Sequence, residues 1–222
     1  MNEAPRDPST DAKSIRHDQQ YIADLIEPGA RVLDVGCGDG RLLYYLVHNA
    51  RIDGRGIELS RDGVTACFHL GLSVIQGDAE ADLKDYPTDS FDYAILSQTL
   101  QTIHDIEGVV GQLLRIGRRA ILSFPNFGHW RVRWRLMTTG RAPKTEALPY
   151  HWYETPNIRI CSILDLLEFC RSQGITVERM IALGNDGTRL ASQTSSVGGL
   201  SAWLANLRAA QGILMISRDR PQ

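Results

Sequence analysis

Three closely spaced glycines follow a short apolar run in "VLDVGCGDG", residues 32–40. Such a run predicts a buried strand that opens into a loop of bare backbone. A side chain at Gly36 or Gly38 would block the approach of a ligand to this backbone. The sequence therefore predicts that Gly36 and Gly38 lie against a bound small molecule.

The spacing of these glycines argues against two common phosphate-binding loops. A dinucleotide loop of the form Gly-x-Gly-x-x-Gly would need glycine at position 41, where this chain has Arg41. A Walker-type loop would need Gly-Lys-Ser/Thr after the glycines, and the chain lacks it. Pyrophosphates and nucleoside triphosphates are therefore disfavoured as ligands.

Two acidic residues end the next two expected strands. Glu58, in "RGIELS", could accept hydrogen bonds from both hydroxyls of a ribose, and its charge would repel a ribose 2′-phosphate. Asp78, in "QGDAEADL", could accept from the exocyclic amine of an adenine. With the glycines, these two carboxylates predict a site for an adenosine that carries no phosphate.

The elements that position these residues alternate between strand and helix. Apolar runs bounded by turn residues predict strands, and apolar residues at helical spacing predict helices. The alternation predicts a parallel sheet with helices on both faces. The expected strands are 31–35, 54–58, 73–76, 93–97, 119–124, 175–183 and 212–217, and the expected helices are 15–26, 41–48, 61–70, 106–115, 163–173 and 202–207.

Two segments are expected to be irregular. Residues 1–14, "MNEAPRDPSTDAKS", are polar and predict a flexible arm. Residues 184–211 are too long for a tight hairpin turn, and the first half of the segment is expected to be mobile. No repeat or linker divides the remainder, so we expect one domain over residues 15–222.

The composition is that of an ordinary globular protein, with 43% hydrophobic and 23% charged residues. The net charge of −2 supplies no overall field that would attract nucleic acid. The four cysteines form no CxxC pairing, so we expect reduced thiols and no metal. No run approaches the roughly 18 apolar residues of a membrane span, and no signal peptide begins the chain. We expect a cytoplasmic protein.

Residues 128–157, "GHWRVRWRLMTTGRAPKTEALPYHWYETPN", hold three of the four tryptophans among four arginines and a lysine. Trp130, Trp134 and Met137 recur at helical spacing, whereas the alternation of Trp130, Val132, Trp134 and Leu136 also permits a strand. We favour a helix. The arginines could grip a carboxylate beneath a lid, or the tryptophans could anchor a protein interface. Composition does not separate these two hypotheses.

The glycine loop and the two acids resemble the class I S-adenosylmethionine-dependent methyltransferase family, over residues 15–218. The resemblance implies a Rossmann-like α/β fold whose seven-stranded, mostly parallel sheet has strand order 3-2-1-4-5-7-6, with "GILMIS" as the antiparallel last strand. It implies S-adenosylmethionine or S-adenosylhomocysteine as ligand. By this resemblance, Asp34, Gly36, Cys37, Gly38 and Gly40 would lie at its methionine end, Glu58 and Leu59 at the ribose and adenine face, Asp78 and Ala79 at the adenine edge, and Gln98 near the sulfonium.

The residues do not identify a methyl acceptor, and methyl transfer to a good nucleophile depends on alignment more than on a base. The Asn/Asp-Pro-Pro-Tyr/Phe signature of amino methyltransferases would follow residues 93–97, where this chain has "SQTLQ". A Pro-Cys nucleophile for pyrimidine C5 is also missing. Candidate bases are His104, His129 and His151, and Tyr150 or Tyr153 could shape a pocket.

The run that begins "FPNFGHW" is similar to the MetW family of methionine biosynthesis proteins. Members carry Pro-Asn-Phe-Gly-His-Trp, Leu-Pro-Tyr-x-Trp-Tyr and Thr-Pro-Asn-Ile segments in this order. The resemblance implies an activating partner of the homoserine O-acyltransferase MetX. A small-molecule methyltransferase is the alternative. We expect docking through an insert at residues 125–160, around Trp130, Arg131, Trp134 and Trp152. The polar segment 185–199 departs from the family pattern.

Overall fold

The structure, a computed structural model, describes residues 15–145, 148–194 and 198–218. The expected flexible arm at residues 1–14 lies outside the described residues. The strands of the described residues are β1 (Arg31–Val35), β2 (Asp53–Glu58), β3 (Ser73–Gln76), β4 (Phe91–Ser97), β5 (Gly117–Pro125), β6 (Ile175–Leu183), β7 (Arg189–Thr194) and β8 (Gln211–Arg218).

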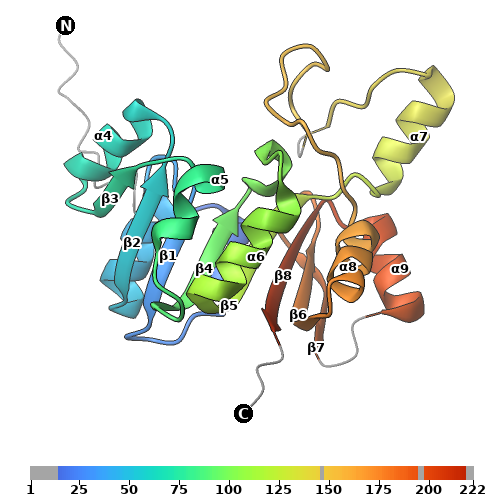
Figure 1. Cartoon of the computed structure of the whole chain (residues 1–222). Coiled ribbons are helices and arrows are strands. Elements are labelled where there is room, and N and C mark those ends of the chain that lie inside the picture. The colour runs from blue at the N-terminus through green and yellow to red at the C-terminus, as the bar shows by residue number, and fades with distance from the viewer. Residues whose placement is uncertain (1–14, 146–147, 195–197, 219–222) are drawn as a thin grey trace, which may run out of the picture.

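These strands form one sheet in the order β3-β2-β1-β4-β5-β8-β6-β7 (Figure 1). The pairs from β3 to β5 are parallel, and the pairs β5·β8, β8·β6 and β6·β7 are antiparallel. The predicted order is confirmed, with "GILMIS" inside the antiparallel strand β8. The sheet is that of the class I methyltransferase fold, with one strand more than predicted.

The additional strand, β7, lies within the segment 184–211, where the sequence predicted no strand. Residues 195–197 of that segment lie outside the described residues. The sequence of β7, "RLASQT", has no apolar alternation, and most of its residues are exposed. An edge strand can form through backbone hydrogen bonds to its neighbour without burying side chains. For this reason the apolar pattern did not reveal it.

The helices are α2 (His17–Ala23), α3 (Arg41–Tyr45), α4 (Arg61–His69), α5 (Ala79–Asp82), α6 (Ile106–Ile116), α7 (Trp130–Thr139), α8 (Ile163–Ser172) and α9 (Gly199–Arg208). Short turns of π-helix (η1, Leu46–Ala50) and 3₁₀-helix (η2, Leu83–Asp85; η3, Leu100–Thr102) complete the set.

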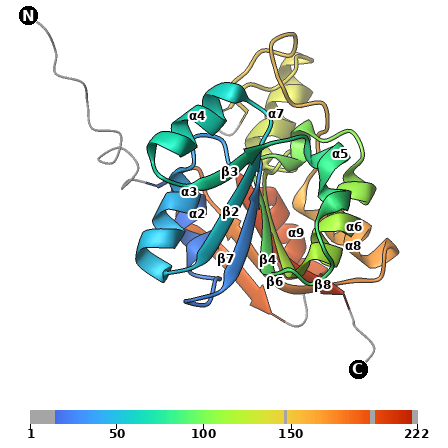
Figure 2. The ribbon, with the colours of Figure 1, turned by 60° about the vertical axis from the view of Figure 1, so that its left-hand side comes forward.

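Two apolar cores lie on opposite faces of the sheet, because successive side chains of a strand point to opposite faces. Leu33 of β1 packs in the core beneath α6, α8 and α9, whereas Val32 packs in the core beneath α2 and α3. Figure 2 shows the strands passing between α2 and α3 on one side and α6 and α8 on the other. The predicted arrangement of helices on both faces is confirmed.

Several helix ends differ from the sequence prediction by one to three residues, and the starts of α3, α4, α6 and α8 agree with it. The first expected helix, residues 15–26, is confined to α2, and the second continues beyond α3 as the π-helical turn η1. Ser162 caps α8 as predicted, in a capping box with Asp165. Gly174, just past its end, has a φ of +63°.

The 125–160 insert leaves the sheet at the end of β5 and returns at the start of α8. Its helix, α7, confirms the helical prediction and extends beyond the sheet in Figure 1. Asn126 fixes the start of the insert: its side-chain amide donates to the carbonyls of Asn206 and Ala209, both at 2.7 Å. Its side-chain oxygen accepts from the backbone N–H groups of Gly128 and Ile163.

Candidate functional site

The carboxyl ends of β1, β2, β3 and β4 meet at one edge of the sheet, at the point where the strand order reverses between β1 and β4. Open α/β sheets bind their ligands at such a point. A cavity of about 390 Å³ lies there, within the ~300–1,000 Å³ typical of ligand pockets. We call it the carboxyl-edge cavity. The predicted site residues that line it are Gly36, Glu58, Leu59, Asp78, Ala79 and Gln98.

The three loop glycines meet different requirements, although all have positive φ. A Cβ at Gly36 would lie 2.7 Å from the hydroxyl oxygen of Thr99, and one at Gly40 would lie 2.7 Å from Sγ of Cys67. A Cβ at Gly38 would meet no described atom within 4 Å. Glycine is therefore required by packing at positions 36 and 40. At Gly38 a Cβ would enter open space, and neither Gly38 nor Gly40 is in the described lining of the carboxyl-edge cavity.

Glu58 joins the glycine loop to the next helix. One carboxylate oxygen accepts from the backbone N–H of Gly38 and the other from that of Ser60, both at 2.8 Å. Ser60 is the N-cap of α4, so the carboxylate is held between two fixed segments. Each oxygen of a carboxylate has a second lone pair, so Glu58 can accept two more hydrogen bonds in the cavity that it lines.

Asp78 and Leu59, which the resemblance assigned to adenine binding, both line the carboxyl-edge cavity. Asp78 caps α5 by accepting from the backbone N–H of Glu80 at 2.9 Å, while its own backbone N–H donates to Asp82. Leu59 is 65% exposed although it is apolar. Its side chain supplies an apolar surface at the rim of the cavity, suited to a flat ring.

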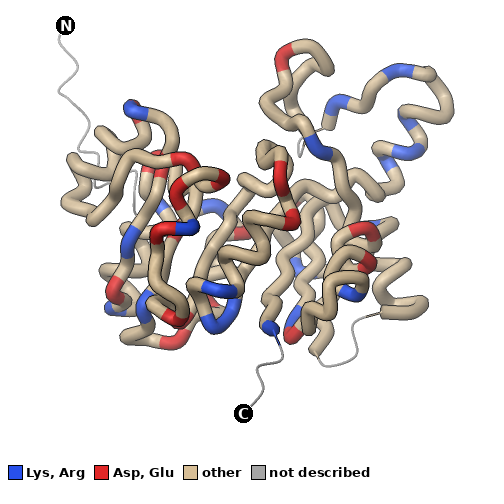
Figure 3. Tube along the Cα trace, in the orientation of Figure 1, with Lys and Arg blue, Asp and Glu red and all other residues tan. Residues whose placement is uncertain are grey.

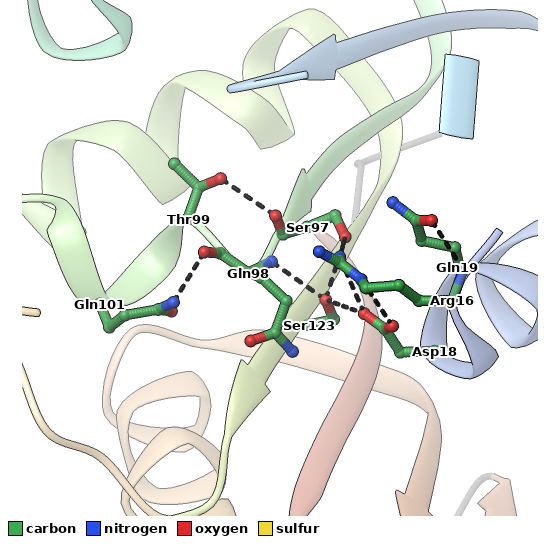
Figure 4. Close-up of polar contacts among 8 residues, drawn as sticks. All are labelled: Arg16, Asp18, Gln19, Ser97, Gln98, Thr99, Gln101 and Ser123. Carbon is green, nitrogen blue, oxygen red and sulfur yellow. Dashed lines mark hydrogen bonds and ion pairs between the residues drawn. The ribbon is translucent and has the colours of Figure 1, made fainter. Parts of the chain in front are cut away.

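Gln98 stands in a strained backbone conformation at the end of β4, with a φ of +54°. Its backbone N–H donates to the carbonyl of Ser123 at 3.0 Å. The same N–H lies 3.1 Å from the Ser123 hydroxyl, and the Gln98 carbonyl accepts from the side chain of Gln101 at 2.6 Å (Figure 4). The side-chain nitrogen of Gln98 is buried and has no hydrogen-bond partner among the described residues. Unpaired buried donors are rare and costly, so this amide is a candidate to bind a ligand.

Asp34 lies beneath the loop, 1% exposed, and is absent from the described lining of the cavity. One of its carboxylate oxygens finds no hydrogen-bond partner in the described part of the chain. Burial raises the pKa of Asp34 to about 7; the charge of Arg16 opposes this rise and that of Glu58 adds to it. A cation reaching this carboxylate would favour its ionised form.

Cys37 turns away from the cavity, with its sulfur 3.9 Å from that of Cys67. The hydrogen bond with Cys67 and burial raise the pKa of Cys37 above its ordinary value. It therefore packs as a neutral thiol, and it is absent from the described lining of the carboxyl-edge cavity. All four cysteines, Cys37, Cys67, Cys161 and Cys170, are free.

The loop after β4 supplies lining residues that the site prediction left out, among them Thr99, Thr102 and His104. The sequence predicted His104 as a candidate base but not as a residue of the ligand site. Its Nδ1 lies 3.2 Å from the carboxylate of Glu80. Glu80 also accepts from the backbone N–H of Asp105 at 2.7 Å, and this bond is the main cause of its lowered pKa. The polar run "SQTLQTIH" was the available signal.

A second polar group beside Gln98 joins residues that are distant in sequence (Figure 4). Arg16 forms an ion pair with the buried carboxylate of Asp18 at 3.1 Å and donates to the hydroxyl of Ser97 at 3.3 Å. The Ser97 and Ser123 hydroxyls lie 3.3 Å apart. No local sequence pattern predicts this cluster, because the tertiary structure alone brings the start of α2 to the ends of β4 and β5.

The insert residues predicted for docking are largely exposed. Trp130, Trp134 and Trp152 are 48%, 58% and 76% exposed, and the Arg131 guanidinium lies 5.5 Å from the centre of the Trp130 ring. His129, another candidate base, is buried at the start of α7; burial lowers its pKa, and the Arg131 charge adds to the effect. The remaining candidates, His151, Tyr150 and Tyr153, line a separate cavity of the insert.

Residues 15–145, 148–194 and 198–218 contain no cluster of three or more His, Cys, Asp or Glu side chains that could hold a metal ion. Within the same residues, no helix combines the length and the apolar character needed to cross a bilayer.

Comparison with known sequences identifies relatives. Residues 16–216 match the family of the methionine biosynthesis protein MetW. The chain is also similar to the bifunctional methionine biosynthesis protein MetXA/MetW of Rhodopirellula baltica, with 32% identity over 173 residues. This alignment covers 74% of the chain but 28% of the relative, so the chain spans less than a third of that protein's length.

Comparison with solved structures identifies the fold. A SAM-dependent methyltransferase from Thermotoga maritima superposes with a TM-score of 0.61 at 18% identity, over 91% of each chain. A SAM-dependent methyltransferase from Archaeoglobus fulgidus gives a TM-score of 0.58 at 15% identity, over 95% of this chain and 94% of that one. At such identities the likeness establishes the fold alone.

Proposed function

The chain belongs to the MetW family of methionine biosynthesis proteins, and from this membership we propose that it binds S-adenosylmethionine or S-adenosylhomocysteine in the carboxyl-edge cavity. The contact that carries this proposal is the hydrogen bond from Gly38 to Glu58. It places a carboxylate with free lone pairs beside open backbone, with no lysine or arginine in the described lining to pair with a phosphate.

The residues present suit this ligand. Glu58 would accept the ribose hydroxyls, Asp78 the adenine amine, and Leu59 would cover the adenine ring. Asp34 would oppose the ammonium of the methionine end through its unpaired oxygen. Gln98 would donate its unpaired amide to a ligand oxygen. When bound, S-adenosylmethionine supplies an electrophilic methyl group; S-adenosylhomocysteine supplies none.

We further propose that the protein acts in the cytoplasm as an activating subunit of a homoserine O-acyltransferase. The name of the Rhodopirellula baltica relative joins MetXA and MetW in one bifunctional protein, and units fused in one chain commonly work together. The exposed tryptophans and arginines of the 125–160 insert suit a protein interface, where these residues are enriched.

A small-molecule methyltransferase is the second candidate. The observation that favours it is the imidazole of His104, which lines the cavity and is oriented by the Glu80 carboxylate. A carboxylate-oriented imidazole can act as a general base toward a methyl acceptor.

One experiment separates the two candidates. The purified protein is mixed with homoserine, acyl-CoA and the acyltransferase, and separately with labelled S-adenosylmethionine and a cell extract. An increased acylation rate without labelled product supports the activating subunit. Labelled product without any effect on acylation supports the methyltransferase. Calorimetry with S-adenosylhomocysteine tests the ligand itself, and absence of binding would remove the cavity assignment.

A further inference from the structure

The 125–160 insert carries positive charges that no described carboxylate neutralises. The ion pairs of the described residues all lie outside it. Within the insert, Arg135 donates to the carbonyl of Lys144, and the Lys144 ammonium lies 3.3 Å from the ring nitrogen of His151. Figure 3 shows blue segments spaced along α7 and the loop that follows it. The exposed cations of α7 and the loop that follows it are Arg131, Arg133, Arg135, Arg141 and Lys144, and Arg159 is exposed at the returning end of the insert.

Some of these charges surround a cavity of about 550 Å³ on the insert. Arg135, Arg141 and Lys144 line it, together with the rings of Tyr150, His151, Trp152 and Tyr153. None of the described residues that line it is acidic. We call this the basic cavity. Guanidinium and ammonium groups with no opposing charge attract carboxylates, and arginine binds them in a bidentate manner.

A smaller apolar cavity of about 160 Å³ adjoins the basic cavity and shares Ala142, Tyr150 and Trp152 with it. Its other walls include the side chains of Phe127 and Ile160. Its size suits one apolar side chain. A ligand that filled both cavities would therefore present an apolar group next to negative charge.

Helix α7, beside these cavities, buries little of its apolar surface against the other described residues. Val132 is its buried residue, whereas Trp134, Leu136 and Met137 are 58%, 49% and 73% exposed. A helix of this length is marginal in water without packing against another surface. A small free anion would pair with the arginines but would leave these apolar side chains exposed. A protein segment would cover both.

We propose that the two cavities bind a segment of the acyltransferase partner that carries an apolar side chain flanked by at least two carboxylates. The apolar side chain occupies the small cavity, and the carboxylates pair with Arg135, Arg141 and Lys144. α7 packs against the same partner through Trp134 and Met137. The inference rests on the proposed partnership and adds the chemistry by which the partner is recognised.

Charge reversal tests the basic cavity. The variant Arg135→Glu/Arg141→Glu/Lys144→Glu is compared with Arg55→Glu/Arg171→Glu/Arg189→Glu, which changes the net charge equally at exposed positions outside the insert. Affinity for the purified acyltransferase is measured by calorimetry at low and high salt. We expect the first variant to lose about 100-fold in affinity and most of its salt dependence, and the control to change less than about threefold.

The substitution Ala142→Trp tests the apolar cavity. Ala142 is exposed and lines both cavities, so the larger side chain blocks the small one without replacing a core residue. We expect a loss of more than about tenfold in acyltransferase affinity. Unchanged thermal unfolding and unchanged S-adenosylhomocysteine affinity would show that both insert variants are folded.

The outcomes are distinct. If the wild-type protein does not bind the acyltransferase, the proposed partnership falls and this inference falls with it. If the wild type binds and the reversed variant binds equally well, or the control loses as much, the partnership stands and the inference is wrong. If the chain alone self-associates through the same three cations in sedimentation experiments, the occupant is a second copy, which also overturns the inference.

Discussion

The side-chain amide of Gln101 donates to the carbonyl oxygen of Gln98 at 2.6 Å. The backbone carbonyl of Gln101 in turn accepts from the backbone N–H groups of Ile158 and Arg159, at 2.9 and 3.0 Å. Arg159 also donates its guanidinium to the carbonyl of His104 at 2.7 Å. The wall of the carboxyl-edge cavity and the returning end of the 125–160 insert are therefore held together by hydrogen bonds.

The substitution Gln101→Ala removes the bond that supports Gln98. We expect the dissociation constant for S-adenosylhomocysteine to rise about 3- to 10-fold, because one buried hydrogen bond contributes about 1 kcal/mol. Calorimetry measures the change, and the exposed Gln173 supplies the matched control, Gln173→Ala. An affinity equal to that of the wild type would show that Gln101 does not support the ligand site.

The substitution Glu58→Ala removes the proposed ribose acceptor and the contact to Gly38. We expect S-adenosylhomocysteine to bind about 5- to 150-fold more weakly, from a loss of about 1–3 kcal/mol. Glu168→Ala, on the exposed side of α8, serves as the control in the same titration. Full affinity in the Glu58 variant would remove the ribose assignment.

The raised pKa of Asp34 predicts a pH dependence of binding. At a pKa of about 7, the carboxyl is neutral at lower pH and cannot oppose the ligand ammonium. We expect affinity for S-adenosylhomocysteine to rise about tenfold between about pH 6 and about pH 8, as the ionised fraction increases. The Asp34→Asn variant should bind weakly and without this dependence. A flat profile for the wild type would contradict the assignment.

The same shift predicts a pH dependence of folding. The unfolded carboxyl titrates near its ordinary value of 3.8, whereas the folded one titrates near 7, so the folded state binds more protons between these values. The contribution of Asp34 to stability is therefore fully present below the lower value and is lost as the pH rises to the higher one. Urea unfolding of the ligand-free protein at several pH values in this range measures the effect. The free energy of unfolding should fall more steeply with pH in the wild type than in Asp34→Asn.

Alanine substitutions in the glycine loop distinguish packing from open space. Gly38→Ala should cost about 1–2 kcal/mol, the strain of a left-handed residue, because its Cβ meets no described atom within 4 Å. Gly40→Ala should lower the free energy of unfolding by about 1–3 kcal/mol more than Gly38→Ala does, because its Cβ would also contact Cys67 and Leu72 at 2.7 Å. Urea denaturation measures both. Equal losses of unfolding free energy in the two variants would show that Cys67 and Leu72 move aside for the new Cβ at no cost.

The sequence located most of the fold because the strands of a parallel sheet are buried on both faces and appear as apolar runs. The limits of β1, β3 and β6 agree with the prediction to the residue. The acids at 58 and 78 were found because the carboxyl ends of such strands meet at one edge, where the structure also places them. The position of Glu58 and Asp78 at the ends of their predicted strands was therefore enough to place both in the candidate site.

The remainder depended on contacts that no local pattern encodes. Arg16 reaches Ser97 across 81 positions, and Glu80 holds the backbone at His104 and Asp105. Each is an ordinary polar residue in its own segment. The unpaired amide of Gln98 is likewise a property of the assembled structure, since burial and the lack of a partner cannot be read from the sequence.

The insert is tied to the domain at two places, through the Asn126 side chain at its start and through the backbone at Ile158 and Arg159 at its end. In the docking that we propose, substitutions between these two anchors would change the partner-facing surface and leave the residues that line the carboxyl-edge cavity in place.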